Sequence, residues 1–115
     1  MADDITIFHN PACSTSRKVL EAIRAAGREP RVVDYLKTGW TAPQLKALFA
    51  KMGVAAREAL RTRNTQAHAL GLTTADDDKV IAAMVADPVL VERPIIETPK
   101  AARLCRPVET VNALL

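Results

Sequence analysis

The chain has 115 residues, with 16 lysines and arginines against 13 aspartates and glutamates, and it carries none of the zinc-finger, basic-zipper or aromatic patterns of nucleic-acid-binding proteins. A 49% hydrophobic content is enough for the core of a single domain, but no apolar run is long enough to span a bilayer. Because the acidic opening Met1-Ala2-Asp3-Asp4 is unlike a signal peptide, we expect a cytoplasmic protein that binds neither nucleic acid nor membrane.

The first third of the chain predicts a strand, a helix and a second strand. Residues 5–9 form a short β-rich run, which predicts a buried strand. Residues 14–26 carry apolar side chains at helical spacing, and Ser14 or Thr15 is expected to cap that helix. Residues 31–36 predict the second strand, which a right-handed connection places parallel to the first.

The middle of the chain predicts helices. Thr41 is expected to cap a helix that Gly53 ends, and residues 55–62 are interpreted as a second helix. The acidic run 76–78 lies where a helix macrodipole favours negative charge. It therefore predicts the start of a further helix, which ends near Asp87.

The last third predicts a hairpin around Pro99-Lys100, because proline favours the first central position of a turn. If the turn has two residues, pairing the residues outward from it along both strands places Arg93 opposite Arg106 at the open end of the hairpin. Like charges opposed in this way are destabilising unless an anion lies between them or the sheet twist separates them. Alternation turns Arg103 away from Arg106, which predicts a structural role for Arg103, and residues 108–115 predict a short closing helix.

The order of these elements is that of a thioredoxin-like α/β fold. A βαβ unit is followed by a helical insertion and then by a C-terminal ββα hairpin unit, and the strands share a mixed four-stranded sheet. We expect the whole chain to form one domain, with the insertion at about residues 41–90.

Cys13 lies in the turn between the first strand and the first helix, and we interpret it as a nucleophile. The N–H groups and dipole of a helix N-terminus stabilise a thiolate and can hold an oxyanion beside it, and Arg17 adds positive charge one turn on. The alternative is a buried, inert thiol, which is the interpretation we prefer for Cys105 at the end of an apolar strand. The sequence leaves a disulfide between the two open. The histidines and cysteines show no zinc-site spacing.

The spacing around Cys13 excludes two other thiol mechanisms. Cys-based phosphatases need a Cys-x5-Arg loop, but Val19 occupies the arginine position. Dithiol oxidoreductases need Cys-x-x-Cys, but Ser16 occupies the second cysteine position. Cys13 therefore has no local resolving partner, which favours a monothiol mechanism that uses an outside thiol, or Cys105 if the fold brings it close.

Three separated motifs resemble those of the glutathione- and glutaredoxin-coupled arsenate reductases. They are residues 5–17, Arg93-Pro94-Ile95-Ile96 and Arg103-Leu104-Cys105-Arg106-Pro107, while residues 52–61 match the family's arginine helix. The resemblance covers nearly the whole chain. It implies a thioredoxin-like fold with an inserted helical region, and it makes Cys13 the nucleophile that attacks arsenate.

The resemblance also implies the roles of further residues. Three arginines would hold the oxyanion and the covalent thiol-arsenate adduct: Arg61, Arg93 and Arg106. Three residues would support them: His9, which tunes the loop electrostatically, Arg17 and Ser16. Taken alone, Arg61 is also compatible with a solvated helix charge, Arg17 with a surface ion pair and His9 with a packed or capping histidine.

The same resemblance implies the partners. Glutathione is the expected co-substrate, arsenite leaves after reduction, and glutaredoxin clears the mixed disulfide. We expect no bound cofactor or metal, a monomer, and a cis peptide bond before Pro94. Two alternatives remain, a glutathione-dependent thiol-disulfide oxidoreductase and a non-enzymatic, redox-linked regulator that binds RNA polymerase.

Overall fold

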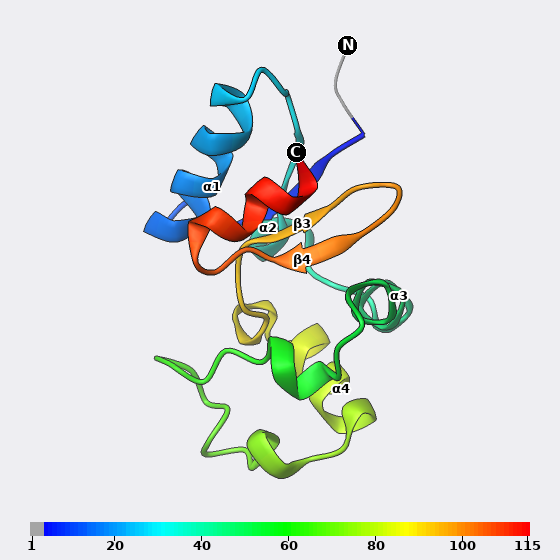
Figure 1. Ribbon diagram of the computed structural model, residues 1–115. Coiled ribbons are helices and arrows are strands. Elements are labelled where there is room, and N and C mark those ends of the chain that lie inside the picture. Colours follow the sequence, from blue (N-terminus) through cyan, green and yellow to red (C-terminus); the bar gives the residue numbers. More distant parts are fainter. Residues whose placement is uncertain (1–3) are drawn as a thin grey trace. The chain divides into compact units, whose positions relative to one another are not determined.

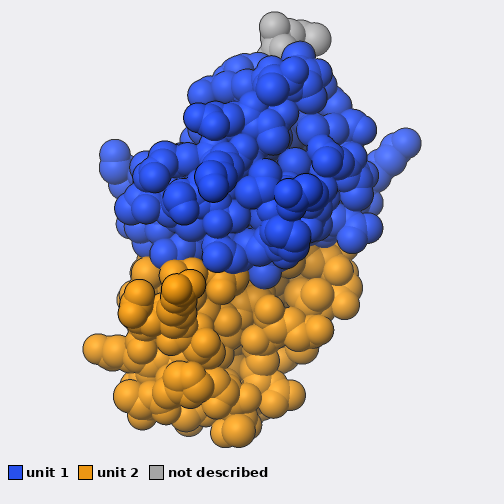
Figure 2. All heavy atoms as spheres, turned by 60° about the vertical axis from the view of Figure 1, so that its left-hand side comes forward, with its two compact units in different colours: residues 1–38, 93–115 blue, residues 39–92 orange. Residues whose placement is uncertain are grey.

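The computed structural model describes residues 4–115, so the start of the acidic opening, residues 1–3, lies outside the described residues (Figure 1). The chain divides into two compact units, coloured separately in Figure 2. The first unit combines Met1–Thr38 with Arg93–Leu115, and the second is Gly39–Glu92. No helix in residues 4–115 has the length and apolar character needed to cross a membrane.

The first unit is built on a mixed β-sheet. Within residues 4–115 its strands are β1 (Thr6–His9), β2 (Arg31–Asp34), β3 (Ile95–Glu97) and β4 (Ala102–Leu104). They lie in the order β2-β1-β3-β4, with β1 parallel to β2 and antiparallel to β3, and β3 antiparallel to β4. The predicted mixed four-stranded sheet is confirmed.

The β3–β4 hairpin has the predicted register. Ile95 lies opposite Leu104, and the same register, continued towards the open end, aligns Arg93 with Arg106. The peptide bonds that follow both arginines lead into prolines, and both are cis. The bond before Pro94 confirms the expectation there, whereas the cis bond before Pro107 was not predicted from the sequence.

Helix α1 (Ser14–Ala25) begins directly after Cys13. Cys13 itself is the N-cap, with extended backbone and no capping bond from its side chain, so the expected cap at Ser14 or Thr15 was wrong. The cause is the preceding turn, in which the N–H of Cys13 donates to the carbonyl oxygen of Asn10 at 3.0 Å. Because the turn ends at Cys13, the helix begins at least one residue earlier than a cap at Ser14 or Thr15 would place it.

Strand β2 ends at Asp34, and Tyr35–Thr38 form the short helix α2. The prediction of a strand through residue 36 was therefore wrong at its end. Asp34 Oδ1 accepts the N–H of Leu36 at 3.2 Å, and this local bond turns the chain out of the strand.

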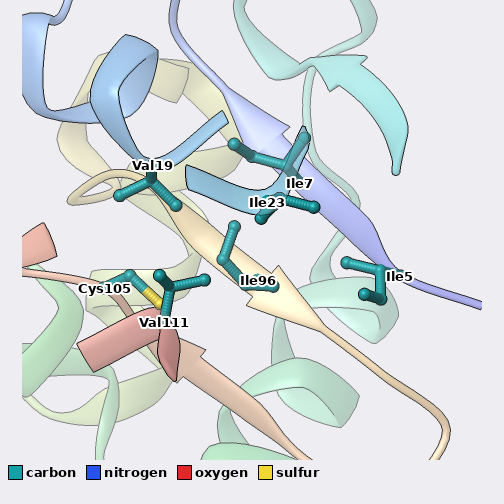
Figure 3. Close-up of a cluster of buried hydrophobic side chains, with 7 residues drawn as sticks. All are labelled: Ile5, Ile7, Val19, Ile23, Ile96, Cys105 and Val111. Carbon is teal, nitrogen blue, oxygen red and sulfur yellow. The ribbon is translucent and has the colours of Figure 1, made fainter. Parts of the chain in front are cut away.

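One hydrophobic cluster packs α1 and the closing 3-10 helix η4 (Val108–Leu114) on the same face of the sheet (Figures 1 and 3). Its buried members are Ile5, Ile7, Val19, Ile23, Ile96, Cys105 and Val111. Since side chains alternate along a strand, Ile5, Ile7 and His9 face α1 together. The cluster thus holds the end of β1 and the start of α1 against each other, and the Cys13 turn lies between them.

The second unit contains the helices α3 (Ala42–Met52) and α4 (Asp77–Ala86). Thr41 Oγ1 accepts the N–H of Gln44 at 3.2 Å in a capping box, as the sequence predicts for that helix. Asp76 caps α4 by accepting the N–H of Lys79 at 2.9 Å.

The helix predicted over residues 55–62 is only the 3-10 turn Ala56–Ala59, so this prediction was wrong. Beyond the turn, the N–H of Arg61 donates to Leu90 O and the N–H of Glu92 donates to Ala59 O, both at 2.8 Å. Because these backbone groups pair with a distant segment, they are not available for a continued helix. Arg61 therefore lies outside the turn and not on an arginine helix.

Candidate active site

The sheet register brings Arg106 to Cys13. Arg106 Nη1 lies 3.8 Å from Cys13 Sγ, within hydrogen-bonding reach of sulfur. The same Nη1 donates to the carbonyl oxygen of Arg93 at 3.1 Å, which fixes the guanidinium against the hairpin. The guanidinium of Arg93 is a further hydrogen-bonding and charged partner of the thiol.

The environment of Cys13 has opposing effects on its thiol. Partial burial raises the pKa of Cys13, but the N–H of Ser16 and the guanidinium groups of Arg93 and Arg106 outweigh burial, so that the pKa lies below its ordinary value. The thiolate, rather than the thiol, is the nucleophile. The lowered pKa favours the thiolate form of Cys13, and the role of Cys13 as the nucleophile stays a prediction.

His9 and Ser16 form a buried pair behind the turn. His9 Nδ1 lies 2.6 Å from Ser16 Oγ, and the same hydroxyl oxygen accepts the N–H of Asn10 at 3.1 Å. Burial is the main reason that the pKa of His9 lies below its ordinary value, which favours a neutral imidazole. Ser16 thus ties the end of β1 to the first turn of α1, while its backbone N–H stabilises the Cys13 thiolate.

Asn10 is a further residue of the site that was not predicted from the sequence. Asn10 Oδ1 accepts the N–H of Ala12 at 3.0 Å, and its carbonyl oxygen accepts the N–H of Cys13 at the same distance. The side chain is buried. Its signal was the Asn-Pro dipeptide, since asparagine before proline favours the start of a turn.

Arg17 lies on the exposed side of the same turn. Its Nη1 donates to the carbonyl oxygen of Pro11 at 2.8 Å. The carbonyl oxygen is a neutral acceptor, and none of the ion pairs described for residues 4–115 includes Arg17, so the surface ion pair considered from the sequence is not found there.

Arg61 belongs to the second unit, where its Nη1 lies 2.7 Å from Glu92 Oε1. The two side chains are only 12% and 21% exposed, so the alternative of a solvated charge at Arg61 was wrong. The role of Arg61 as an oxyanion ligand stays a prediction.

Cys105 belongs to the hydrophobic core and not to the turn that carries Cys13. It is buried in the hydrophobic cluster, and burial raises the pKa of its thiol to about 12 (Figure 3). Both cysteines are free, so the disulfide that the sequence left open is not formed. Within residues 4–115, no group of three or more histidine, cysteine, aspartate or glutamate side chains could hold a metal ion.

The amino-acid sequence of the chain matches a known protein family and several known proteins. The ArsC family matches residues 8–114. The arsenate reductase ArsI2 of Synechocystis sp. is 52% identical over 113 residues, which cover 96% of this chain and 81% of that protein. The arsenate reductase of Escherichia coli K12 is 46% identical over 97% of this chain and 81% of its own length.

A solved structure gives the same result for the fold. The arsenate reductase from Vibrio cholerae superposes with a TM-score of 0.93 at 36% identity, and the match covers 100% of both chains. The predicted thioredoxin-like α/β fold is confirmed.

Proposed function

The chain belongs to the ArsC family, and from this premise we propose that it reduces arsenate to arsenite with Cys13 as the nucleophile. The observation that carries the proposal is the 3.8 Å approach of Arg106 Nη1 to Cys13 Sγ at a helix N-terminus. Arginine guanidinium groups match tetrahedral oxyanions, so the groups that stabilise the thiolate are also suited to hold its substrate.

The first step is attack of the Cys13 thiolate on arsenic. A sulfur–arsenic bond forms, an arsenic–oxygen bond breaks, and the oxygen leaves as water after protonation. Arg93 and Arg106 lie beside the thiol on the hairpin and would balance the charge of the adduct. Arsenic remains pentavalent at this stage.

The second step is reduction by glutathione. Its thiolate attacks the Cys13 sulfur of the adduct, so a disulfide bond forms and the sulfur–arsenic bond breaks. The electron pair of the broken bond stays on arsenic, which is thereby reduced from the pentavalent to the trivalent state and leaves as arsenite. Cys13 then carries glutathione as a mixed disulfide, which glutaredoxin reduces by thiol–disulfide exchange. An outside thiol is required in this scheme because Ser16 replaces a local second cysteine and Cys105 is buried with a raised pKa.

We retain Arg61 as a third oxyanion ligand because the family resemblance extends over the segment that carries it. Its bond to Glu92 would hold the guanidinium in one orientation. The cytoplasmic location and the monomeric state stay predictions.

The proposal is tested by arsenate-dependent NADPH oxidation with glutathione, glutaredoxin and glutathione reductase. The wild-type protein and Cys105→Ala should turn over, whereas Cys13→Ser should not, since only Cys13 has a stabilised thiolate. Full turnover by Cys13→Ser would exclude the mechanism. Disulfide exchange without any dependence on arsenate would favour the oxidoreductase alternative, and recovery of RNA polymerase in a pull-down with an inactive protein would favour the regulator.

A further inference from the structure

Arg17 is held beside the Cys13 turn. It is one helical turn beyond Cys13, and its N–H donates to the carbonyl oxygen of Cys13 at 3.0 Å. Residues at this spacing lie on the same side of a helix. The bond from Arg17 Nη1 to Pro11 O, at 2.8 Å, directs the side chain back towards the loop that carries the thiol.

The charge of Arg17 is not balanced by a carboxylate. Its side-chain partner, Pro11 O, is neutral, and none of the ion pairs described for residues 4–115 includes Arg17. Arg24 on the same helix is different, because its Nη2 lies 3.1 Å from Glu29 Oε1. A guanidinium has five N–H donors, so one bond to a carbonyl leaves Arg17 able to bind a carboxylate with the others.

We propose that Arg17 binds a carboxylate of glutathione while the glutathione thiol attacks at Cys13. This inference rests on the proposed function and identifies a contact for its second substrate. Glutathione has a carboxylate at each end and must approach an adduct that is already anionic. During that step Arg93 and Arg106 hold the oxyanion, so a further cation is needed to offset the repulsion and orient the thiol.

The test uses thiol exchange and needs no arsenate. Cys13 is first converted to its mixed disulfide with thionitrobenzoate, and the coloured thiolate released by glutathione is followed in a stopped-flow instrument. Arg17→Gln should lower the second-order rate with glutathione about fivefold, the upper range for a solvent-exposed charge pair. With glutathione diethyl ester, which has no free carboxylate, the ratio between wild type and variant should be close to one.

Two matched variants separate specific binding from a general charge effect. Lys18→Gln removes the neighbouring exposed cation, and Arg24→Gln removes one that is already paired. Both should retain the wild-type rate. A loss in Lys18→Gln equal to that in Arg17→Gln would overturn the proposal, because diffuse attraction would then explain the effect.

A structural role of Arg17 would give another result. If loss of the bond to Pro11 O displaced the turn, Arg17→Gln would react more slowly with the diester, and free Cys13 would react more slowly with neutral iodoacetamide. Either outcome overturns the proposal. An absence of arsenate turnover in the wild type would instead refute the proposed function, and the exchange rates would still show whether Arg17 selects carboxylates.

Discussion

Replacing Arg106 with glutamine should destabilise the thiolate form of Cys13 relative to the thiol and so raise the pKa of Cys13 by a measurable amount. Unit charges separated by the observed 3.8 Å interact by about 1 kcal/mol in a water-like medium and by about 4 kcal/mol at an effective dielectric constant of 20. Cys13 is only partly buried, and charge pairs that water can reach contribute at most about 1 kcal/mol, so we use the lower value. A loss of about 1 kcal/mol lowers the ratio of thiolate to thiol about fivefold.

The assay is the rate of Cys13 alkylation by iodoacetamide as a function of pH. Because Arg106 helps to hold the pKa of Cys13 below its ordinary value, Arg106→Gln should move the rate profile to higher pH. At low pH the variant should react about fivefold more slowly, and at high pH, where both thiols are ionised, the rates should converge. Arg103→Gln, an exposed substitution on β4, is the matched control and should leave the profile in place.

Two results would refute this reasoning. An unchanged profile in Arg106→Gln would mean that the 3.8 Å approach has no electrostatic effect on the thiol in solution. An equal displacement in Arg103→Gln would mean that the total charge of the hairpin, and not the contact, sets the pKa of Cys13.

Three further predictions concern stability and are measured by urea unfolding. Ile96→Ala should lower the free energy of unfolding by about 2–5 kcal/mol, because Ile96 is fully buried; a loss below 1 kcal/mol would contradict the described core. Burial raises the pKa of Cys105 to about 12 in the fold from its ordinary value of 9.0, so above pH 9 the unfolded chain binds fewer protons than the folded one. The free energy of unfolding should therefore fall above pH 9 by about 1.4 kcal/mol per pH unit relative to that of Cys105→Ala, and parallel pH curves for the two proteins would contradict this. Glu92→Gln should lower the free energy of unfolding by roughly 2–4 kcal/mol, because it removes the carboxylate that pairs with the mostly buried Arg61. Arg24→Gln breaks a half-exposed ion pair and should lower it by less than about 1 kcal/mol. Similar losses in the two variants would contradict the difference in burial between the two pairs.

Local patterns were sufficient where the deciding bonds are local. The Thr41 cap of α3 was predictable because its partner Gln44 lies three residues away. The hairpin register was predictable because a two-residue turn at Pro99-Lys100 determines every pairing behind it, including the alignment of Arg93 with Arg106.

Predictions failed where a nearby polar group or a distant segment competes for the backbone. Residues 55–62 have a helical pattern, but the backbone groups of Ala59 and Arg61 pair with those of Glu92 and Leu90 instead. Strand β2 stops at Asp34 because a carboxylate accepts the N–H of Leu36, although Tyr35 and Leu36 suit a strand.

The sequence alone determined that Cys13 stands at a strand-to-helix turn without a local resolving cysteine, and that Arg93 and Arg106 come to the same end of one hairpin. Only the tertiary structure decided that Arg106 reaches the sulfur, that His9 and Ser16 share a buried hydrogen bond, and that Arg61 pairs with Glu92. The reason is physical: periodicity and turn chemistry depend on neighbours along the chain. The state of the thiol depends on a balance between burial and charges that only folding brings together.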